Sequence, residues 1–298
     1  MAQNRSVSIT GFGIVSAIGV GKQETLDSLL SNRTGIGRLK YLKTVHTEFP
    51  VGEVKLSDEE MERILGIAPG TPATRTALMG MLALHEALSD ACLGRGDLLQ
   101  AAFLNGTTVG GMDKSEQYYT DFIENDTRNE YIKSHDCGSC SEMTADRFGR
   151  FRYITTISTA CSSAANAIAL GGDMIRAGRA DIVVAGGSEC ITKFHLNGFN
   201  SLMILDRELC RPFDATRAGL NLGEGAAYLV LESDESVRKR GVKPIALLSG
   251  YGNACDAYHQ TASSPDGEGA YLAMSRALAD AGLAPADIDY VNAHGTGT

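Results

Sequence analysis

The sequence predicts an α/β protein whose mostly parallel sheet carries helices on its faces. Short β-branched or apolar runs alternate along the chain with segments rich in Ala, Leu and Met, which is the order of βαβ units. Hydrophobic residues make up 43% of the 298 residues, enough to bury the core of one large domain or two smaller ones. The 34 glycines gather in Gly-Gly and Gly-x-Gly runs, which indicate tight turns and close backbone approaches.

The first third of the chain contains the clearest helical signals. Leucines at helical spacing follow Lys22, and the stretch after Thr74 is the longest Ala-, Leu- and Met-rich pattern in this part. Ser57 and Glu60 predict a capping box that opens a short helix. In chain order, we expect a strand at 6–10 followed by a Gly-Phe-Gly turn at 11–13, helices at 22–31, 57–65 and 74–91, and a buried strand at 101–109.

The remainder alternates in the same way after a polar stretch at 113–150 with weak helical segments. The run Asp-Ile-Val-Val-Ala at 181–185 is typical of a fully buried strand, because it is apolar on both faces and ends at Gly186-Gly187. We expect strands at 153–158, 181–185, 226–231, 245–250 and 288–292, and helices at 164–177 and 269–281.

Charge and motif content exclude several classes of function. A formal net charge of −9, with no basic run longer than Arg238-Lys239-Arg240, argues against a nucleic-acid partner. No apolar stretch approaches 18 residues and the N-terminus lacks a signal-like segment, so we expect no membrane association. Gly11-Phe12-Gly13 lacks the third glycine of a dinucleotide site, and Gly186-Gly187-Ser188-Glu189 does not match a serine-hydrolase elbow. We therefore expect no cofactor.

The seven cysteines are scattered, which favours reduced thiols in the cytoplasm. One Cys-x-x-Cys occurs at Cys137 and Cys140. A zinc site needs a second ligand pair, and the other cysteines are single, so we expect no metal.

Cys161 is the strongest candidate for a catalytic residue. A β-branched run ends in the small-residue turn before it, and an Ala-rich helix begins just after it. The positive end of a helix dipole and its unpaired N–H groups favour a thiolate, which is the nucleophilic form. The N–H of Cys161 is placed to help hold an oxyanion. A buried structural cysteine is the alternative, since free cysteines are among the most buried residues.

Thr-Ala-Cys-Ser-Ser at 159–163 resembles the nucleophile motif of the β-ketoacyl-acyl-carrier-protein synthases. Other stretches resemble the same family in the same order: Arg-Pro-Phe-Asp at 211–214, Gly-Glu-Gly-Ala at 223–226, Asp-Ala-Tyr-His at 256–259 and Asn-Ala-His-Gly-Thr-Gly-Thr at 292–298. The last of these is similar to the first histidine motif of the elongating type, which uses two histidines. The resemblance implies a thiolase-like layered αβαβα fold, with residues 1–244 as the nucleophile-bearing half and 245–298 as the start of an incomplete C-terminal half.

The resemblance also implies a reaction and its residues. Cys161 would take an acyl group from a carrier-protein or coenzyme A thioester, and a decarboxylated malonyl thioester would attack it to give a 3-oxoacyl product. His294 would stabilise negative charge on a thioester oxygen. Thr296 and Thr298 would hold the pantetheine arm, and Phe199 would gate the acyl pocket. A core-packing role is the alternative for Phe199, and a hydrogen-bonded core position is the alternative for His294.

The implied partners are acyl-carrier protein, carrying acyl and malonyl thioesters, and a second copy of the chain. For the homodimer, we expect the strand at 153–158 to form the interface edge. Two other functions remain open: a non-catalytic chain-length partner of an active synthase, and a thiolase-like enzyme acting on coenzyme A substrates. Cys161 argues against the first, and the His-Gly-Thr-Gly-Thr motif argues against the second.

Members of the family continue past the first histidine motif to a lysine, a second histidine and a Gly-rich loop. We therefore expect this chain to be an N-terminal fragment, one part of a split enzyme or an inactive relative, and the first two are favoured because the surroundings of Cys161 look intact. Alone, it would be acylated without condensing. We also expect Asp214 and Glu224 to organise the loop at 219–225 by pairing with Arg211 or Arg217.

Overall fold

A seven-stranded mixed sheet forms the centre of the computed structural model, which describes residues 5–259 and 263–298. The strand order is β2-β1-β6-β5-β3-β4, and β7 pairs with β1. The strands are β1 (Val7–Ser16), β2 (Gly19–Val20), β3 (Ala101–Gly106), β4 (Tyr153–Ile157), β5 (Ile182–Glu189), β6 (Gly225–Ser233) and β7 (Ala246–Leu247).

Helices connect these strands and confirm the α/β class. They are α1 (Lys22–Leu30), α2 (Asp58–Leu65), α3 (Arg75–Asp90), α4 (Arg95–Leu98), α5 (Met112–Thr120), α6 (Cys137–Asp146), α7 (Ser163–Arg176), α8 (Lys193–Ser201), α9 (Asp234–Arg240) and α10 (Glu268–Ala281). Single turns occur at Asp121–Asn125, Asn129–Tyr131 and Pro285–Asp287. The capping box is present, since Ser57 accepts from Glu60 N–H and the Glu60 carboxylate accepts from Ser57 N–H.

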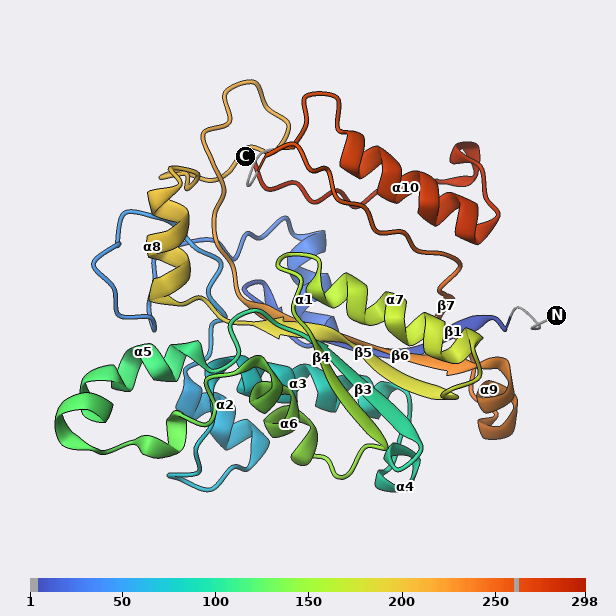
Figure 1. Ribbon diagram of the computed structural model, residues 1–298, viewed down its shortest axis with the longest axis horizontal. Coiled ribbons are helices and arrows are strands. Elements are labelled where there is room, and N and C mark those ends of the chain that lie inside the picture. Colours follow the sequence, from blue (N-terminus) through green and yellow to red (C-terminus); the bar gives the residue numbers. More distant parts are fainter. Residues whose placement is uncertain (1–4, 260–262) are drawn as a thin grey trace.

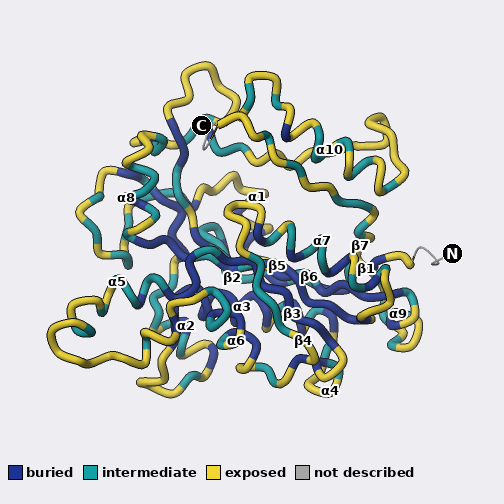
Figure 2. Tube along the Cα trace, viewed as in Figure 1, coloured by how far each residue is buried: buried dark blue, intermediate teal, exposed yellow. Residues whose placement is uncertain are grey.

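The elements form layers (Figure 1). Helices α3 and α6 lie under the sheet, α7 lies on its upper face, and α10 lies beyond α7. The described residues contain one sheet, so the αβαβα architecture is represented by its α-β-α part together with α10. In Figure 2 the sheet and its adjoining helix faces are buried, whereas the segment after β7 is mostly exposed.

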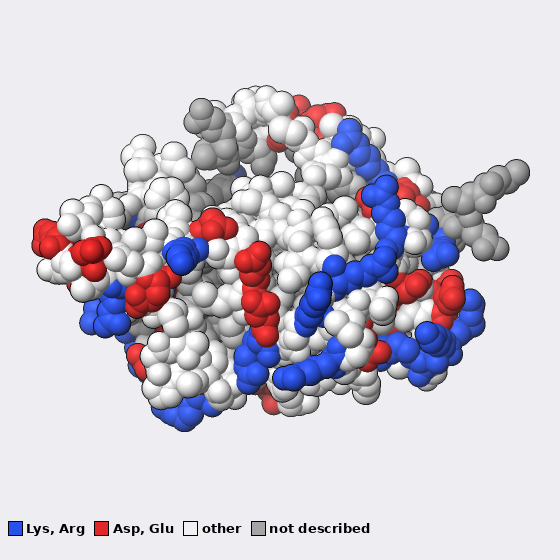
Figure 3. Space-filling model, turned by 60° about the horizontal axis from the view of Figure 1, so that its bottom comes forward, with Lys and Arg blue, Asp and Glu red and all other residues white. Residues whose placement is uncertain are grey.

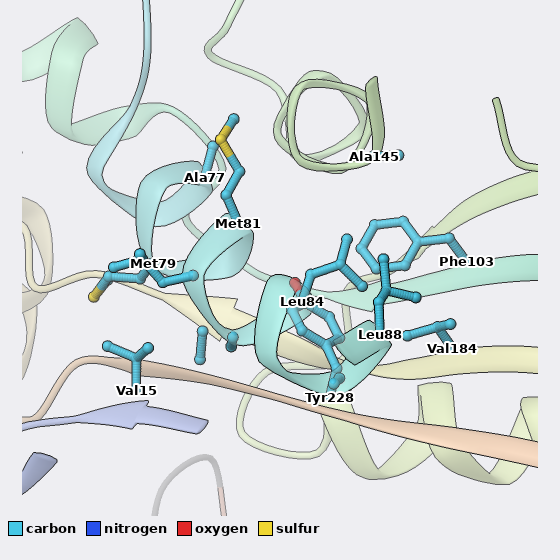
Figure 4. Close-up of a cluster of buried hydrophobic side chains, with 14 of the residues drawn as sticks. Val15, Ala77, Met79, Met81, Leu84, Leu88, Phe103, Ala145, Val184 and Tyr228 are labelled. Carbon is cyan, nitrogen blue, oxygen red and sulfur yellow. The ribbon is translucent and has the colours of Figure 1, made fainter. Parts of the chain in front are cut away.

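The larger core lies between the sheet and α3 (Figure 4). Because α3 is covered by the sheet on one side and by α2 and α6 on the other, Leu78 and Leu84 are fully buried. Tyr228 of β6 packs its ring 5.3 Å from that of Phe103, and its hydroxyl donates to Asn105 Oδ1 at 2.8 Å. A smaller core joins the upper face of the sheet to α7.

The prediction of a mostly parallel sheet is wrong. Only β3–β4 and β3–β5 are parallel, whereas β6 runs antiparallel to both β1 and β5. The long segment at 190–224 leaves β5 and returns to β6 at the same edge, where Glu189 faces Gly225. The residue composition of a strand does not indicate whether it runs parallel or antiparallel to its neighbours. The sequence pattern alone therefore could not predict that β6 is antiparallel.

Two other predictions differ from the structure. The expected turn at 11–13 is part of β1, which continues through a bulge between Ile9 and Gly11. The expected strand at 245–250 shortens to β7, and residues 288–292 form no strand. Tyr290 is 81% exposed, because no described strand lies beside this run to cover or pair with it.

Candidate active site

The candidate site lies at one edge of the sheet. The parallel strands β3, β4 and β5 all end there, at Gly106, Ile157 and Glu189. Binding sites in open α/β sheets form outside such carboxyl ends. The loops that follow these strands therefore meet at this edge, and one of them carries Cys161.

Cys161 is exposed and lies two residues before α7. The helix can begin close to the sheet because two strand positions lack a side chain. A Cβ on Gly106 would lie 2.5 Å from Ala164 N, and one on Gly187 would lie 3.0 Å from Ala164 Cβ. Glycine at these two positions thus brings the first turn of α7, and the loop before it, onto the edge of the sheet.

Hydrogen bonds define the conformation of the loop at 159–162. The Ser163 hydroxyl accepts from Thr159 N–H at 2.9 Å and donates to the Ala160 carbonyl at 2.7 Å. Ala160 has a φ of 53°, a left-handed conformation that costs an alanine about 1–3 kcal/mol. Within the described residues, the Cys161 N–H donates to no protein acceptor, so it is free to contact a substrate oxygen.

Asn166 connects this loop to the C-terminal part of the chain. Its side-chain amide donates to Thr159 Oγ1 at 2.8 Å and to Ser162 Oγ at 3.2 Å. Its Oδ1 accepts from Asn253 Nδ2 at 2.8 Å. Sequence reasoning assigned Asn166 no role, although it lies in the first turns of a helix one turn beyond the nucleophile. Asn253 carried no sequence signal.

The neighbouring loop after β3 is held by the carboxylate of Glu189. This carboxylate accepts from the backbone N–H groups of Thr108 and Val109 at 2.9 and 2.8 Å. It also accepts from the hydroxyls of Thr107 and Thr108. Two loops of the candidate site are therefore fixed by side-chain-to-backbone bonds, which sequence reasoning did not identify.

The histidine motif lies against the loop at 210–219. A Cβ on Gly297 would lie 2.5 Å from the Gly219 carbonyl oxygen, and one on Gly295 would lie 3.7 Å from Pro212. Arg217 Nε donates to the Thr298 carbonyl at 3.3 Å. Two motifs far apart in the sequence, Arg-Pro-Phe-Asp and His-Gly-Thr-Gly-Thr, thus come together.

The predicted site residues fall into separate groups. The hydroxyls of Thr296 and Thr298 lie 2.9 Å apart. Phe199 is half-buried on α8, with its ring 6.2 Å from that of His195. His294 is exposed. Within residues 5–259 and 263–298, no hydrogen bond or ring contact joins Cys161, His294 and Phe199 to one another.

The expected pairing of the two acidic loop residues is wrong. Glu224 forms a buried ion pair with Arg75, at 2.5 Å, and also accepts from Val54 and Ile191 N–H. Asp214 accepts from the N–H and hydroxyl of Thr216, and hydrogen bonds from Thr216 lower the pKa of Asp214. Proximity in the sequence favours Arg211 or Arg217, but the fold brings Glu224 to the start of α3.

Asp58, Asp113 and Lys114 extend the Arg75–Glu224 pair into a larger charged cluster. Arg75 Nη1 lies 2.9 Å and Lys114 Nζ 2.7 Å from the Asp58 carboxylate. Burial raises the pKa of Asp113 to about 6, and its Oδ1 is buried without a hydrogen-bond partner. The cluster joins α2, α3, α5 and the start of β6 beneath the candidate site.

Cys140 and Cys190 are buried, unlike Cys161. Burial raises the pKa of Cys140 to about 12 and raises that of Cys190 well above its usual value. Among the described residues, no group of three or more His, Cys, Asp or Glu side chains is arranged to hold a metal ion. In the same part of the chain, no helix is long and apolar enough to cross a bilayer.

Comparisons with known proteins agree with the motifs. Two family models match: Beta-ketoacyl synthase, N-terminal domain, over residues 4–236, and Beta-ketoacyl synthase, C-terminal domain, over residues 245–298. Nodulation protein E of Rhizobium meliloti (strain 1021) is 35% identical over 304 residues, which cover 99% of this chain and 74% of that protein.

A second relative and a solved structure give the same result. The 3-oxoacyl-[acyl-carrier-protein] synthase 2 of Staphylococcus aureus (strain N315) is 32% identical over 314 residues, covering 100% of this chain and 74% of that protein. The ishigamide ketosynthase/chain length factor structure matches with a TM-score of 0.90 at 33% identity, covering 99% of this chain and 74% of that one.

These matches show that the chain is an acyltransferase with a thiolase-like α/β fold. It belongs to the β-ketoacyl synthase family, as the motifs predicted.

Proposed function

We propose that this protein is a 3-oxoacyl-[acyl-carrier-protein] synthase of the elongating type, with Cys161 as its acyl-accepting nucleophile. Family membership supports the reaction class. The observation that carries the proposal is the position of Cys161, which is exposed at the carboxyl edge of the sheet, next to the start of α7. A thiol there lies near the positive end of the helix dipole and next to its own free N–H.

The reaction proceeds in two steps. The Cys161 thiolate attacks the carbonyl of an acyl carrier-protein thioester, and the carrier leaves as a thiolate, which takes up a proton to become a thiol. A malonyl thioester then loses CO₂, and the resulting carbanion attacks the acyl-cysteine. A carbon–carbon bond forms, the thiolate of Cys161 is released, and the product is a 3-oxoacyl thioester. The covalent intermediate replaces one difficult step by two easier ones.

We assign the remaining site residues by their motifs and their surroundings. The Cys161 N–H contributes to an oxyanion hole in the first step. His294 donates to the malonyl thioester oxygen, where negative charge develops in the second. The adjacent hydroxyls of Thr296 and Thr298 support a role in holding the polar pantetheine arm. Phe199 forms part of the acyl pocket from α8.

We extend the proposal to organisation, partner and compartment. Residues 1–244 form the nucleophile-bearing half and 245–298 the start of the histidine-bearing half.

The acyl donor is an acyl-carrier protein, and the chain pairs with a second copy through β4. This strand lies at an edge of the sheet, pairs only with β3 among the described strands, and exposes 48% of Tyr153. A thiol nucleophile needs a reducing compartment, which favours the cytoplasm.

A chain-length partner of an active synthase is the second candidate. The ishigamide structure that matches this chain is a ketosynthase/chain length factor, so similarity to it is compatible with either kind of chain. A non-catalytic partner has no need of an accessible nucleophile. Cys161 therefore favours the synthase.

Acylation of the purified full chain tests the proposal. Incubation with an acyl-carrier protein bearing a saturated chain should increase the intact mass by one acyl group, located at Cys161 by peptide mapping. Cys161→Ser should abolish this adduct. Cys255→Ser is the matched control, because Cys255 is also exposed, and it should acylate normally. An unmodified chain, or an adduct that persists in Cys161→Ser, would contradict the assignment.

A further inference from the structure

A cavity of about 440 Å³ lies under the sheet, on the side opposite α7. It is lined by residues of α2, α3, α4 and the segment after α6, and it is partly open to solvent. Its volume falls within the ~300–1,000 Å³ typical of small-molecule sites. The proposed condensation uses none of the residues that line it.

The floor of the cavity is apolar. It is formed by Leu65 of α2, Leu82 and Leu88 of α3, and Leu98 of α4, which are all buried within the protein yet face this space. Figure 4 shows Leu88 on α3, beside Phe103 and Val184. Water in such a recess has few hydrogen-bond partners, so an apolar group that displaces it gains free energy.

The rim of the cavity carries positive charge. Arg95 and Arg147 line it together with His85, whose ring stacks 6.1 Å from that of Phe148, and no Asp or Glu is among the lining residues. Neither arginine forms an ion pair within the described residues. Figure 3 turns this underside forward and shows a band of Lys and Arg side chains on it, next to a stripe of Asp and Glu side chains.

Arg147 is held at this rim. Its Nη2 donates to the Leu65 carbonyl, at the end of α2. This bond uses one of the five N–H donors of the guanidinium and leaves the others for a ligand. Arg95 begins α4, which contributes Leu98 to the floor. The two guanidiniums therefore border the same apolar recess.

We propose that this cavity binds an amphipathic anion with a single linear apolar chain. The chain occupies the leucine floor, and an oxyanion headgroup, either carboxylate or phosphate, is bound by Arg95 and Arg147. Guanidinium groups match both headgroups through paired N–H donors. The site is separate from Cys161, because the sheet lies between α3 and α7.

Direct binding measurements on the full chain in a Cys161→Ser background test this inference without acyl transfer. The probes are decanoate, decyl phosphate and decyltrimethylammonium, each titrated calorimetrically below its micelle concentration. At least one of the two anions should bind at one saturable site, and the cation should not. Binding of decanoate alone identifies a carboxylate ligand, and binding of decyl phosphate alone identifies a phosphate ligand.

Variants assign that binding to the cavity. The double variant Arg95→Gln with Arg147→Gln should weaken anion binding by about tenfold or more, as expected for loss of charge-assisted hydrogen bonds. Leu93→Trp, which fills the recess from a half-buried position, should weaken it as well. Arg179→Gln, at an exposed arginine beyond α7, should bind normally. Absence of anion binding, equal binding of the cation, or unchanged binding in both cavity variants with native circular dichroism would overturn the proposal.

Discussion

Asn166 connects the nucleophile loop to the C-terminal part of the chain. It donates to Thr159 and Ser162 on one side and accepts from Asn253 on the other. The thiol of Cys161 has to approach a thioester carbonyl at a defined angle, and small displacements of a reacting group have large effects on rate. We therefore expect Asn166 to act on the proposed reaction through the position of Cys161.

We expect Asn166→Ala to slow acylation of Cys161 by about tenfold, because the loop loses two donors while the thiol remains. The measurement is the rate of acyl adduct formation by mass spectrometry at saturating donor. Asn253→Ala is the matched control, since it removes only the link to the C-terminal part, and its effect should be smaller. Equal rates for Asn166→Ala and the parent chain would show that the loop positions Cys161 without this side chain.

Asp113 predicts a pH dependence of stability. Burial raises its pKa to about 6, from 3.8 when it is unfolded and exposed. Between these values the folded state binds the proton that the unfolded state releases, so the contribution of Asp113 to stability falls as pH rises through this window. We expect Asp113→Asn to remove this loss, with a gain on the order of 1–3 kcal/mol at pH 7.5 and little change at pH 4.

Urea unfolding of the parent chain and of Asp113→Asn at both pH values measures the difference. The amide keeps an acceptor for the N–H of Arg75, which Asp113 Oδ2 accepts at 2.9 Å, so the fold should be retained. A variant that loses more stability at pH 7.5 than at pH 4 would show that Lys114 holds the pKa of Asp113 below its unfolded value, contrary to the effect of burial.

At the scale of elements, most helices and the buried strands could be predicted from local pattern. The capping box at Ser57 and the apolar length of α3 are local features, and both are present in the structure. Strand direction is not local: β6 reverses between β1 and β5 because the segment at 190–224 returns to its starting edge. The run at 288–292 has strand composition, but a strand also needs a neighbour.

The Arg75–Glu224 pair shows why elements assemble as they do. It joins the start of α3 to the start of β6, with a sequence separation of 149 between its members. No local pattern could predict this pairing, since two closer arginines are available in the sequence. Both side chains are nearly inaccessible, at 9% and 1% of their side-chain surface. Loss of one partner therefore leaves a buried charge without compensation.

We expect Glu224→Ala to reduce the free energy of unfolding by about 3–5 kcal/mol, the range for breaking a buried ion pair from one side. Glu208→Ala is the control, because its ion pair with Arg211 is 3.1 Å long but 75% of the Glu208 side chain is exposed. An exposed pair contributes about 0–1 kcal/mol. Urea denaturation followed by circular dichroism compares the two, and a similar loss in both variants would contradict the stabilising role of the buried Glu224 carboxylate.

At the scale of the whole molecule, the candidate site is assembled from two parts of the chain. Sequence motifs predicted a thiol just before a helix, and Cys161 lies two residues before α7; the grouping of Cys161 with His294 and Phe199 stays a prediction. They could not predict that the histidine motif contacts the loop at 210–219, or that Asn253 reaches Asn166. Both contacts depend on how the segment after β7 packs on α7.

That packing depends on a small number of polar contacts at Arg176, which leads to a last prediction. Arg176 lies 2.8 Å from the Asp280 carboxylate, donates to the Ser249 carbonyl at 2.9 Å and stacks 4.8 Å from the Tyr251 ring. We expect Arg176→Ala to increase limited proteolysis within residues 245–298 by severalfold, while the sheet up to β6 stays resistant. Local opening of this segment costs less free energy because few of its apolar contacts are buried.

Arg179→Ala, at an exposed arginine just beyond the end of the same helix, is the control and should be cleaved at the parent rate. The measurement is the rate of fragment formation by mass spectrometry at low protease concentration. Equal cleavage of both variants would show that other contacts, such as those from Tyr251 to Asp173 and from Asn253 to Asn166, hold the C-terminal segment on α7 without Arg176.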